Sequence, residues 1–347
     1  MRLPLLALLA SLAVVVGCGS SGAAGDRAKA EAATRAAEQV GAIVRFGGDW
    51  KTDFTRHTVP LREFQSGGPG KDGIPALDHP TFVKTDRVRF LNAREPVIEL
   101  VLGSQARAYP LQILIWHEIV NDRIGHTPVA VTFCPLCNTA IAFDRRVGGR
   151  TLSFGTTGNL RNSDLVMYDR QTESWWQQFG GDGVVGRYAG RRLRQVPVRI
   201  VAWREFLRAH PHGLVLSQST GYSKPYGSNP YVGYDDVSSP PFFPVKNGND
   251  QRLPPKERVV FIARSREAVA ISLTTLVKRR RIDVSVAAHE LVIRFRPGVS
   301  SALDRRAIAE GRDVGEVSVS EGGRPVAFTE PFWFAVAAFR PDVKIVR

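Results

Sequence analysis

Apolar and polar residues alternate along much of the chain, which is the period of a β-strand with one buried face. Segments with this pattern are residues 97–102, 106–109, 129–133, 140–145 and 151–154. Turn signals separate two pairs of them, at Gly103-Ser104-Gln105 and at Gly148-Gly149. Helical periodicity is confined to residues 111–120 and 202–210. The pattern predicts an α+β fold that is β-rich.

The apolar pattern also repeats within the chain. Residues 95–133 align without a gap with residues 257–295. Two shorter blocks recur in the same order: Gly148-Gly149-Arg150 as Gly322-Gly323-Arg324, and Glu173-Ser174-Trp175-Trp176 as Glu330-Pro331-Phe332-Trp333. Because separate blocks keep their order, we expect two weakly related, duplicated halves in one compact domain, at about residues 70–200 and 240–345.

The first residues have the pattern of an exported lipoprotein. Residues 3–16 are apolar, but this run falls short of the ~20 residues that span a bilayer. Val15-Val16-Gly17 before Cys18 is typical of a lipoprotein cleavage site. We expect residues 1–17 to be a signal peptide and Cys18 to carry the lipid. The protein would then be anchored to the cell membrane, on its periplasmic or extracellular face.

This leader divides the chain into three parts. Residues 18–40 begin with glycine, serine and alanine, and we expect a flexible tether that forms at most a marginal helix. Residues 41–347 are expected to form the single β-rich domain.

The chain is strongly basic, with a formal net charge of +14. Nucleic acid is not an expected partner, because exported lipoproteins do not normally meet it and the arginines are scattered along the chain. Contact with anionic lipid head groups or cell-wall polymers is a better match, and a solvated basic surface is the simplest explanation.

The strongest chemical signal is the pair Cys134 and Cys137, separated by Pro135-Leu136 between two predicted strands. A Cys-x-x-Cys pair closes a small disulfide, acts as a redox dithiol or binds a metal ion. So small a disulfide loop contributes only ~2 kcal/mol to stability. A thioredoxin-like dithiol needs a helix after the first cysteine, whereas the residues after Cys137 have a strand pattern. Metal binding is the favoured hypothesis, and the other two stay open.

Two cysteines need further ligands to complete a tetrahedral site. His117 offers the best imidazole, and Met167 is the methionine that remains once the signal peptide is removed. Two thiolates, an imidazole and a thioether suit copper(I) better than zinc. The second half has Arg279, Arg296 and Val299 where the first has His117, Cys134 and Cys137. We therefore place the candidate site in the first half. A weaker acid/base grouping of Asp164, Asp169, Glu173 and Arg170 is better explained as a salt-bridged strand end.

Several segments together resemble a known family. They are residues 72–80, 108–111, 116–122, 133–137, 143–145 and 165–170. They are similar to the Domain of Unknown Function 3179 family of bacterial and archaeal proteins, which are often exported. The resemblance implies membership without a mechanism, and the family pattern includes the segments around His117, Cys134 and Cys137. The same segments contain residues expected to support the site: Trp116, Glu118, Asp144, Asp169 and Arg170. Asn138 replaces a common family glycine, and asparagine tolerates the left-handed turn expected there.

The sequence thus predicts a membrane-anchored lipoprotein that binds copper or zinc. A thiol-redox or metal-dependent enzyme of the cell envelope is one alternative. A structural or interaction lipoprotein, braced by a small disulfide, is the other.

Overall fold

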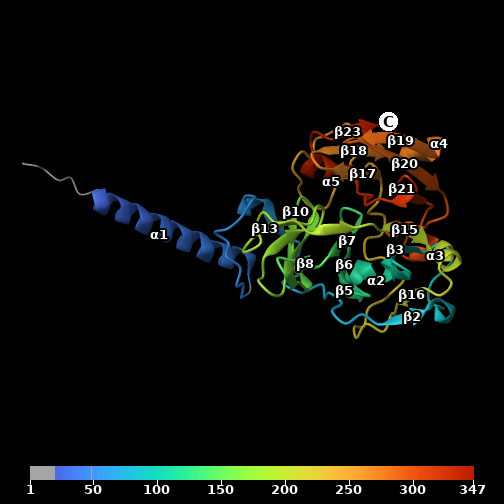
Figure 1. Ribbon diagram of the computed structural model, residues 1–347, viewed down its shortest axis with the longest axis horizontal. Coiled ribbons are helices and arrows are strands. Elements are labelled where there is room, and N and C mark those ends of the chain that lie inside the picture. The colour runs from blue at the N-terminus through green and yellow to red at the C-terminus, as the bar shows by residue number, and fades with distance from the viewer. Residues whose placement is uncertain (1–19, 48) are drawn as a thin grey trace, which may run out of the picture.

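The computed structural model describes residues 20–47 and 49–347. With 38% of residues in strands and 18% in helices, it confirms the prediction of a β-rich chain. The strands form a five-bladed β-propeller, an arrangement that the hydrophobic pattern did not reveal (Figure 1).

Three of the larger sheets come from the part of the chain before residue 217. The first has the order β1 (Phe64–Ser66), β10 (Phe154–Arg161), β11 (Asp164–Asp169), β12 (Trp175–Gln177) and β13 (Asp182–Val185). The second has the order β14 (Arg194–Val196), β7 (Thr139–Asp144), β6 (Thr127–Cys134) and β5 (Ile119–Ile124). The third has the order β15 (Arg199–Ala202), β3 (Pro96–Leu102), β4 (Gln105–Pro110), β16 (Leu214–Leu216) and β2 (Phe82–Lys84).

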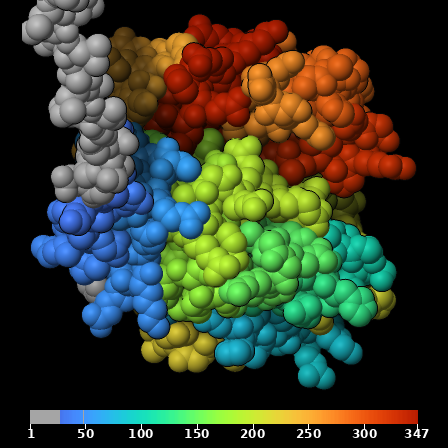
Figure 2. Space-filling view, turned by 60° about the vertical axis from the view of Figure 1, so that its left-hand side comes forward, coloured from blue at the N-terminus to red at the C-terminus, as the bar shows by residue number. Residues whose placement is uncertain are grey.

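The C-terminal part of the chain adds two further sheets. One has the order β17 (Val259–Arg264), β18 (Glu267–Ser272) and β23 (Lys344–Val346). The other has the order β19 (Arg281–Val286), β20 (His289–Arg296), β21 (Glu316–Glu321) and β22 (Arg324–Pro325). A small ribbon pairs β8 (Arg146–Val147) with β9 (Arg150–Thr151) around the predicted glycine turn. In Figure 2 the C-terminal residues pack directly against the green and yellow-green middle of the chain.

Short helices connect the strands. The α-helices after α1 are α2 (Leu111–His117), α3 (Trp203–Ala209), α4 (Leu273–Arg279) and α5 (Trp333–Phe339). Single 3-10 turns occur at Leu61–Glu63, Thr85–Arg87 and Ile308–Glu310. The predicted helices at 111–120 and 202–210 are therefore confirmed in shorter form, because β5 begins at Ile119 and α3 begins only after β15 ends at Ala202.

Residues 20–40 of the expected tether belong to one long helix. Helix α1 (Ser20–Phe46) projects from the propeller (Figure 1), and the expected domain boundary after residue 40 falls inside it. Its C-terminal end docks, where Ala42, Ile43 and Phe46 join an apolar cluster. Among the described residues, no helix is long and apolar enough to cross a membrane. The predicted signal peptide and Cys18 lie outside the described residues.

Two stretches of the propeller share an order of elements. The succession β3, β4, α2, β5, β6 recurs as β17, β18, α4, β19, β20, and α2 and α4 both have seven residues. In addition, β16 pairs in parallel with β4, as β23 does with β18. The propeller as a whole has five blades rather than two halves, and the duplication stays a prediction.

Aromatic packing fixes the end of α1 to the sheet that contains β12. The ring of Trp175 lies 4.9 Å from that of Phe46 and 5.2–5.3 Å from those of Trp50, Phe54 and Phe64. Such pairs prefer these centroid distances and add to the free energy of burial.

Replacing this tryptophan tests how far the cluster stabilises the fold. Because Trp175 is fully buried, Trp175→Ala should lower the free energy of unfolding by about 3–5 kcal/mol. Val232→Ala, at a side chain 51% exposed, is the control and should change it by less than about 0.5 kcal/mol. Urea unfolding followed by circular dichroism measures the free energy of unfolding of both variants. Equal losses in the two variants would contradict a stabilising role of the Trp175 cluster.

Candidate metal centre

The two cysteines lie on a tight turn between neighbouring strands. Strand β6 ends at Cys134, β7 begins at Thr139, and these two residues are register partners. Asn138 has a φ of 58°, a conformation that asparagine tolerates better than most residues. Its Nδ2 donates a hydrogen bond to the carbonyl of Glu330 at 2.7 Å. The predicted turn with a left-handed residue after the second cysteine is present.

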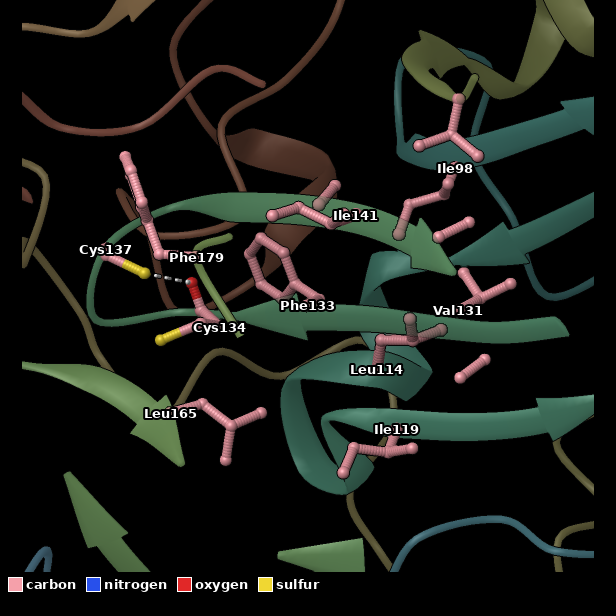
Figure 3. Close-up of a cluster of buried hydrophobic side chains, with 14 of the residues drawn as sticks. Ile98, Leu114, Ile119, Val131, Phe133, Cys134, Cys137, Ile141, Leu165 and Phe179 are labelled. Carbon is pink, nitrogen blue, oxygen red and sulfur yellow. Dashed lines mark hydrogen bonds between the residues drawn. The ribbon is translucent and has the colours of Figure 1, made fainter. Parts of the chain in front are cut away.

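Both cysteines are free and buried, with exposed fractions of 1% for Cys134 and 0% for Cys137. Figure 3 shows their side chains at one end of the hairpin formed by β6 and β7, beside Leu165 of β11. The Cys137 thiol donates to Asp164 Oδ1 at 2.8 Å, and Thr139 Oγ1 lies 3.0 Å from the same sulfur. The turn therefore directs its second sulfur towards a carboxylate from another blade.

Asp164 completes a group of three ligand atoms. The two sulfurs and a carboxylate oxygen of Asp164 all lie within 4.8 Å of one another. A tetrahedral zinc site with bonds of ~2.0–2.3 Å has ligand atoms roughly 3.3–3.8 Å apart. The three residues can therefore bind one metal ion with small adjustments, and a fourth position stays available for another ligand.

The other oxygen of Asp164 is held in place by the protein. Its Oδ2 accepts hydrogen bonds from Gln177 Nε2 at 2.5 Å and from the backbone N–H of Phe179 at 2.9 Å. Ligating carboxylates are commonly oriented by such hydrogen bonds. Because Oδ2 is occupied, Oδ1 is the oxygen presented to the sulfurs.

Burial disfavours the charged forms of these groups. It raises the pKa of the Cys134 thiol and, more strongly, that of Cys137, and the charge of Asp164 adds to both shifts. Burial also raises the pKa of Asp164 to about 6, against several hydrogen bonds that lower it. Without a cation the two thiols therefore retain their protons near neutral pH, and a bound metal ion would replace them.

Glu118 is a second buried acid in this region. It follows α2 with a φ of 57°, and its carbonyl accepts a hydrogen bond from the N–H of Phe133, the residue before Cys134. Burial and then the charge of Asp164 raise the pKa of Glu118 to about 8. The charge of Glu118 in turn contributes to the raised pKa of Cys134.

His117 lies outside the three-residue group. Its Nδ1 contacts the carbonyl of Pro75 and its Nε2 contacts the hydroxyl of Tyr226, both at 2.7 Å. A ring with both nitrogens engaged must give up one of these hydrogen bonds before it can bind a metal. The end of α2 places this imidazole against residues 75 and 226, and its role as a ligand stays a prediction.

Met167 is fully buried on β11, opposite Trp176 in the strand register. The period of two along a strand places Met167 and Asp164 on opposite faces. Packing accounts for its position, and its role as a ligand stays a prediction.

Four of the expected supporting residues contact other parts of the protein. Asp144 pairs with Arg146 and Arg194 at the far end of β7 from Thr139. Asp169 binds Thr172 and Trp176 Nε1 at the opposite end of β11 from Asp164. Arg170 pairs with Asp72 and Asp78, and Trp116 Nε1 donates to the carbonyl of Ser228. Glu118 differs from these four, because its charge contributes to the raised pKa of Cys134.

Later segments of the chain cover the turn. The Phe332 N–H donates to the carbonyl of Cys137 at 3.0 Å, and the Tyr234 hydroxyl donates to the carbonyl of Leu136 at 3.0 Å. Residues about 100 and 200 positions further along the chain thus satisfy the backbone carbonyls of the turn and cover the two thiols.

The fold and the site together define a β-propeller with a buried Cys-Cys-Asp group. The chain belongs to the DUF3179 family, whose model, described as "Protein of unknown function (DUF3179)", matches residues 71–343. No curated protein and no solved structure shows significant similarity to the chain.

The raised pKa of Glu118 predicts how stability depends on pH in metal-free protein. The folded state keeps a proton that the unfolded chain releases above a pKa of 4.5, so the free energy of unfolding falls as the pH rises towards about 8. Glu118→Gln removes this titration. Between about pH 5 and pH 8 the variant should gain on the order of 3 kcal/mol relative to the unaltered protein.

Urea unfolding at several pH values, in the presence of a chelator, measures this difference. Glu310→Gln, at an exposed glutamate, controls for the loss of a surface charge. A stability difference that does not change with pH would show that Glu118 titrates normally.

Proposed function

We propose that this protein is an extracytoplasmic metal-binding module whose ligands are Cys134, Cys137 and Asp164. The observation that carries the proposal is the convergence of these three ligand atoms within 4.8 Å inside the core. Buried polar groups of this kind need a partner, and a divalent cation satisfies two thiolates and a carboxylate at once.

Zinc is the metal that this ligand set fits best. Two thiolates and one carboxylate combine soft and hard ligands, and zinc accepts sulfur, nitrogen and oxygen in tetrahedral sites. Copper(I), expected from a set with His117 and Met167, prefers soft ligands throughout. With the carboxylate of Asp164 as a ligand, zinc is therefore the preferred metal and copper(I) is the second candidate.

Redox catalysis by the dithiol has less support. Reactive cysteines have a lowered pKa, because the thiolate is the nucleophile. Burial raises the pKa of both thiols here, so few thiolates would form near neutral pH without a metal. The free thiols likewise give no support to a structural disulfide.

A metal-dependent enzyme is the second candidate function, and Glu118 is the observation that favours it. Three protein ligands leave a fourth position for water, as in catalytic zinc sites. With a pKa of about 8, the buried carboxyl of Glu118 keeps its proton near neutral pH and is suited to donate it as a general acid.

Metal analysis after ligand replacement tests the proposed site. Cys134→Ser and Asp164→Asn should each weaken zinc binding by at least about 100-fold, because even outer groups at metal sites contribute 10–100-fold. His117→Gln and Met167→Leu should retain the metal. The measurement is zinc content and affinity in protein purified without a histidine tag.

The matched control for the lost carboxylate is Asp283→Asn, since Asp283 is exposed and pairs with Arg281. Protein that binds neither zinc nor copper(I) under reducing conditions would overturn the proposal. Loss of metal in His117→Gln alone would restore the imidazole to the ligand set.

We also propose that the protein is exported and anchored by lipid on Cys18. Support comes from the apolar run at residues 3–16 and from Val15-Val16-Gly17 before the cysteine. Contact between the basic surface and anionic lipid or cell-wall polymer belongs to the same proposal. The shared order of elements in β3–β6 and β17–β20 supports a further proposal, that the two stretches are diverged copies.

Fatty-acid labelling tests the anchor. In cells that express the full chain, the unaltered protein should take up labelled palmitate and sediment with membranes. Cys18→Ala should abolish labelling, because no thioether can form at alanine. Labelling that persists in Cys18→Ala would exclude this anchor, and Cys134→Ser should label normally.

A further inference from the structure

A large cavity opens between the sheet that contains β12 and β13 and the C-terminal elements β17 and α5. Its volume is about 670 Å³, within the range of roughly 300–1,000 Å³ that is common for ligand sites. None of the residues proposed to bind metal lines it.

Aromatic rings form an apolar part of its wall. Phe179 stacks on Phe339, with ring centroids 4.8 Å apart and planes at 19°, and lies 5.4 Å from Phe261. Phe328 also lines the cavity. Such a wall offers apolar aromatic surface to a planar or apolar ligand.

The rest of the lining is strongly cationic. It contains Arg161, Arg191, Arg192, Lys246 and Arg340, with Asp182 as the acidic residue. Arg161 is neutralised by Glu63, and Arg192 by Asp182.

Three of these cations remain uncompensated. In the described part of the chain, Arg191, Lys246 and Arg340 form no ion pair. Arginine pairs well with carboxylate, phosphate and sulfonate oxygens, so these side chains provide an anion site.

An unused polar group lies in the same wall. Thr329 lines the cavity and is 5% exposed, and its Oγ1 has no hydrogen-bond partner among the described residues. Its backbone N–H and carbonyl are both bonded to Phe261, so the hydroxyl is the group left available. A buried hydroxyl without a partner favours a ligand that supplies one.

We propose that this cavity binds a small organic anion with a planar apolar part. The anionic group contacts Arg191, Lys246 and Arg340, and the apolar part lies on Phe179 and Phe339. The inference does not depend on a bound metal. The two sites share a wall, however, because Gln177 and Phe179 line the cavity and also donate to Asp164.

A fluorescent pair of probes separates charge from apolar contact. The anion 1-anilinonaphthalene-8-sulfonate should bind the purified protein, and the uncharged N-phenyl-1-naphthylamine should bind at least about tenfold more weakly. Added salt should weaken binding of the anion and leave the uncharged probe unaffected. Equal affinities with no salt dependence would overturn the proposal without any variant.

Variants then locate the site. Arg191→Gln combined with Arg340→Gln should weaken binding of the anion by about tenfold or more, because each replaces a charged hydrogen bond. The matched control is Arg208→Gln with Arg281→Gln, at exposed arginines outside the cavity. Phe339→Leu should weaken both probes. Unchanged affinity in the first double variant would place the binding elsewhere.

One further variant distinguishes this proposal from the metal site. Cys134→Ser should lose zinc and still bind the anionic probe. Conversely, the Arg191/Arg340 double variant should retain zinc. If the protein does not bind zinc, the proposal of an anion site therefore still stands, and if it does not bind the anionic probe, the proposal of a metal site still stands.

Discussion

The constraint on which this structure depends is the burial of two thiols and a carboxylate at one point in the core. Asp164 and Cys137 are fully buried, and their hydrogen bond joins the turn after β6 to the start of β11. Charges in such surroundings must be neutralised by protons or by a cation. The neighbouring acid Glu118 increases this requirement, because burial and then the charge of Asp164 raise its own pKa. One physical condition therefore connects blade packing, protonation and the capacity to hold a metal ion.

The sequence predicted the local parts of this arrangement well. Strand periodicity located β3, β4, β6 and β7, and the Cys-Pro-Leu-Cys spacing located the turn, since both depend on residues close in sequence. Asp164 was not identified as the third member of the buried group, because it meets Cys137 only through packing between blades. Its sequence signal, an acid directly after Asn162-Ser163, equally fits a strand end. The direction of the His117 ring is set by its contacts with Pro75 and Tyr226. Both residues are far from His117 in sequence, so no short-range pattern indicates these contacts.

The five-bladed arrangement also escaped prediction for a physical reason. Alternation with a period of two indicates that a strand has one buried face, but it does not indicate which sheet covers that face. Closure of the propeller brings Phe332 and Glu330 onto the cysteine turn, and Tyr234 onto Leu136. The part of the chain without thiols thus still helps to build the site, because it supplies the hydrogen bonds that enclose it.

Helix α1 has a consequence for where the propeller sits. Its 27 residues correspond to a rod of about 40 Å at 1.5 Å per residue, and its C-terminal end packs on the blades. With a lipid at Cys18, an upright rod would hold the propeller several screening lengths from the head groups, since charges act over only about 8–10 Å at physiological salt. Under that geometry the arginines of the blades would attract solutes and polymers that diffuse past. They would reach the bilayer itself only when the rod lies down along it.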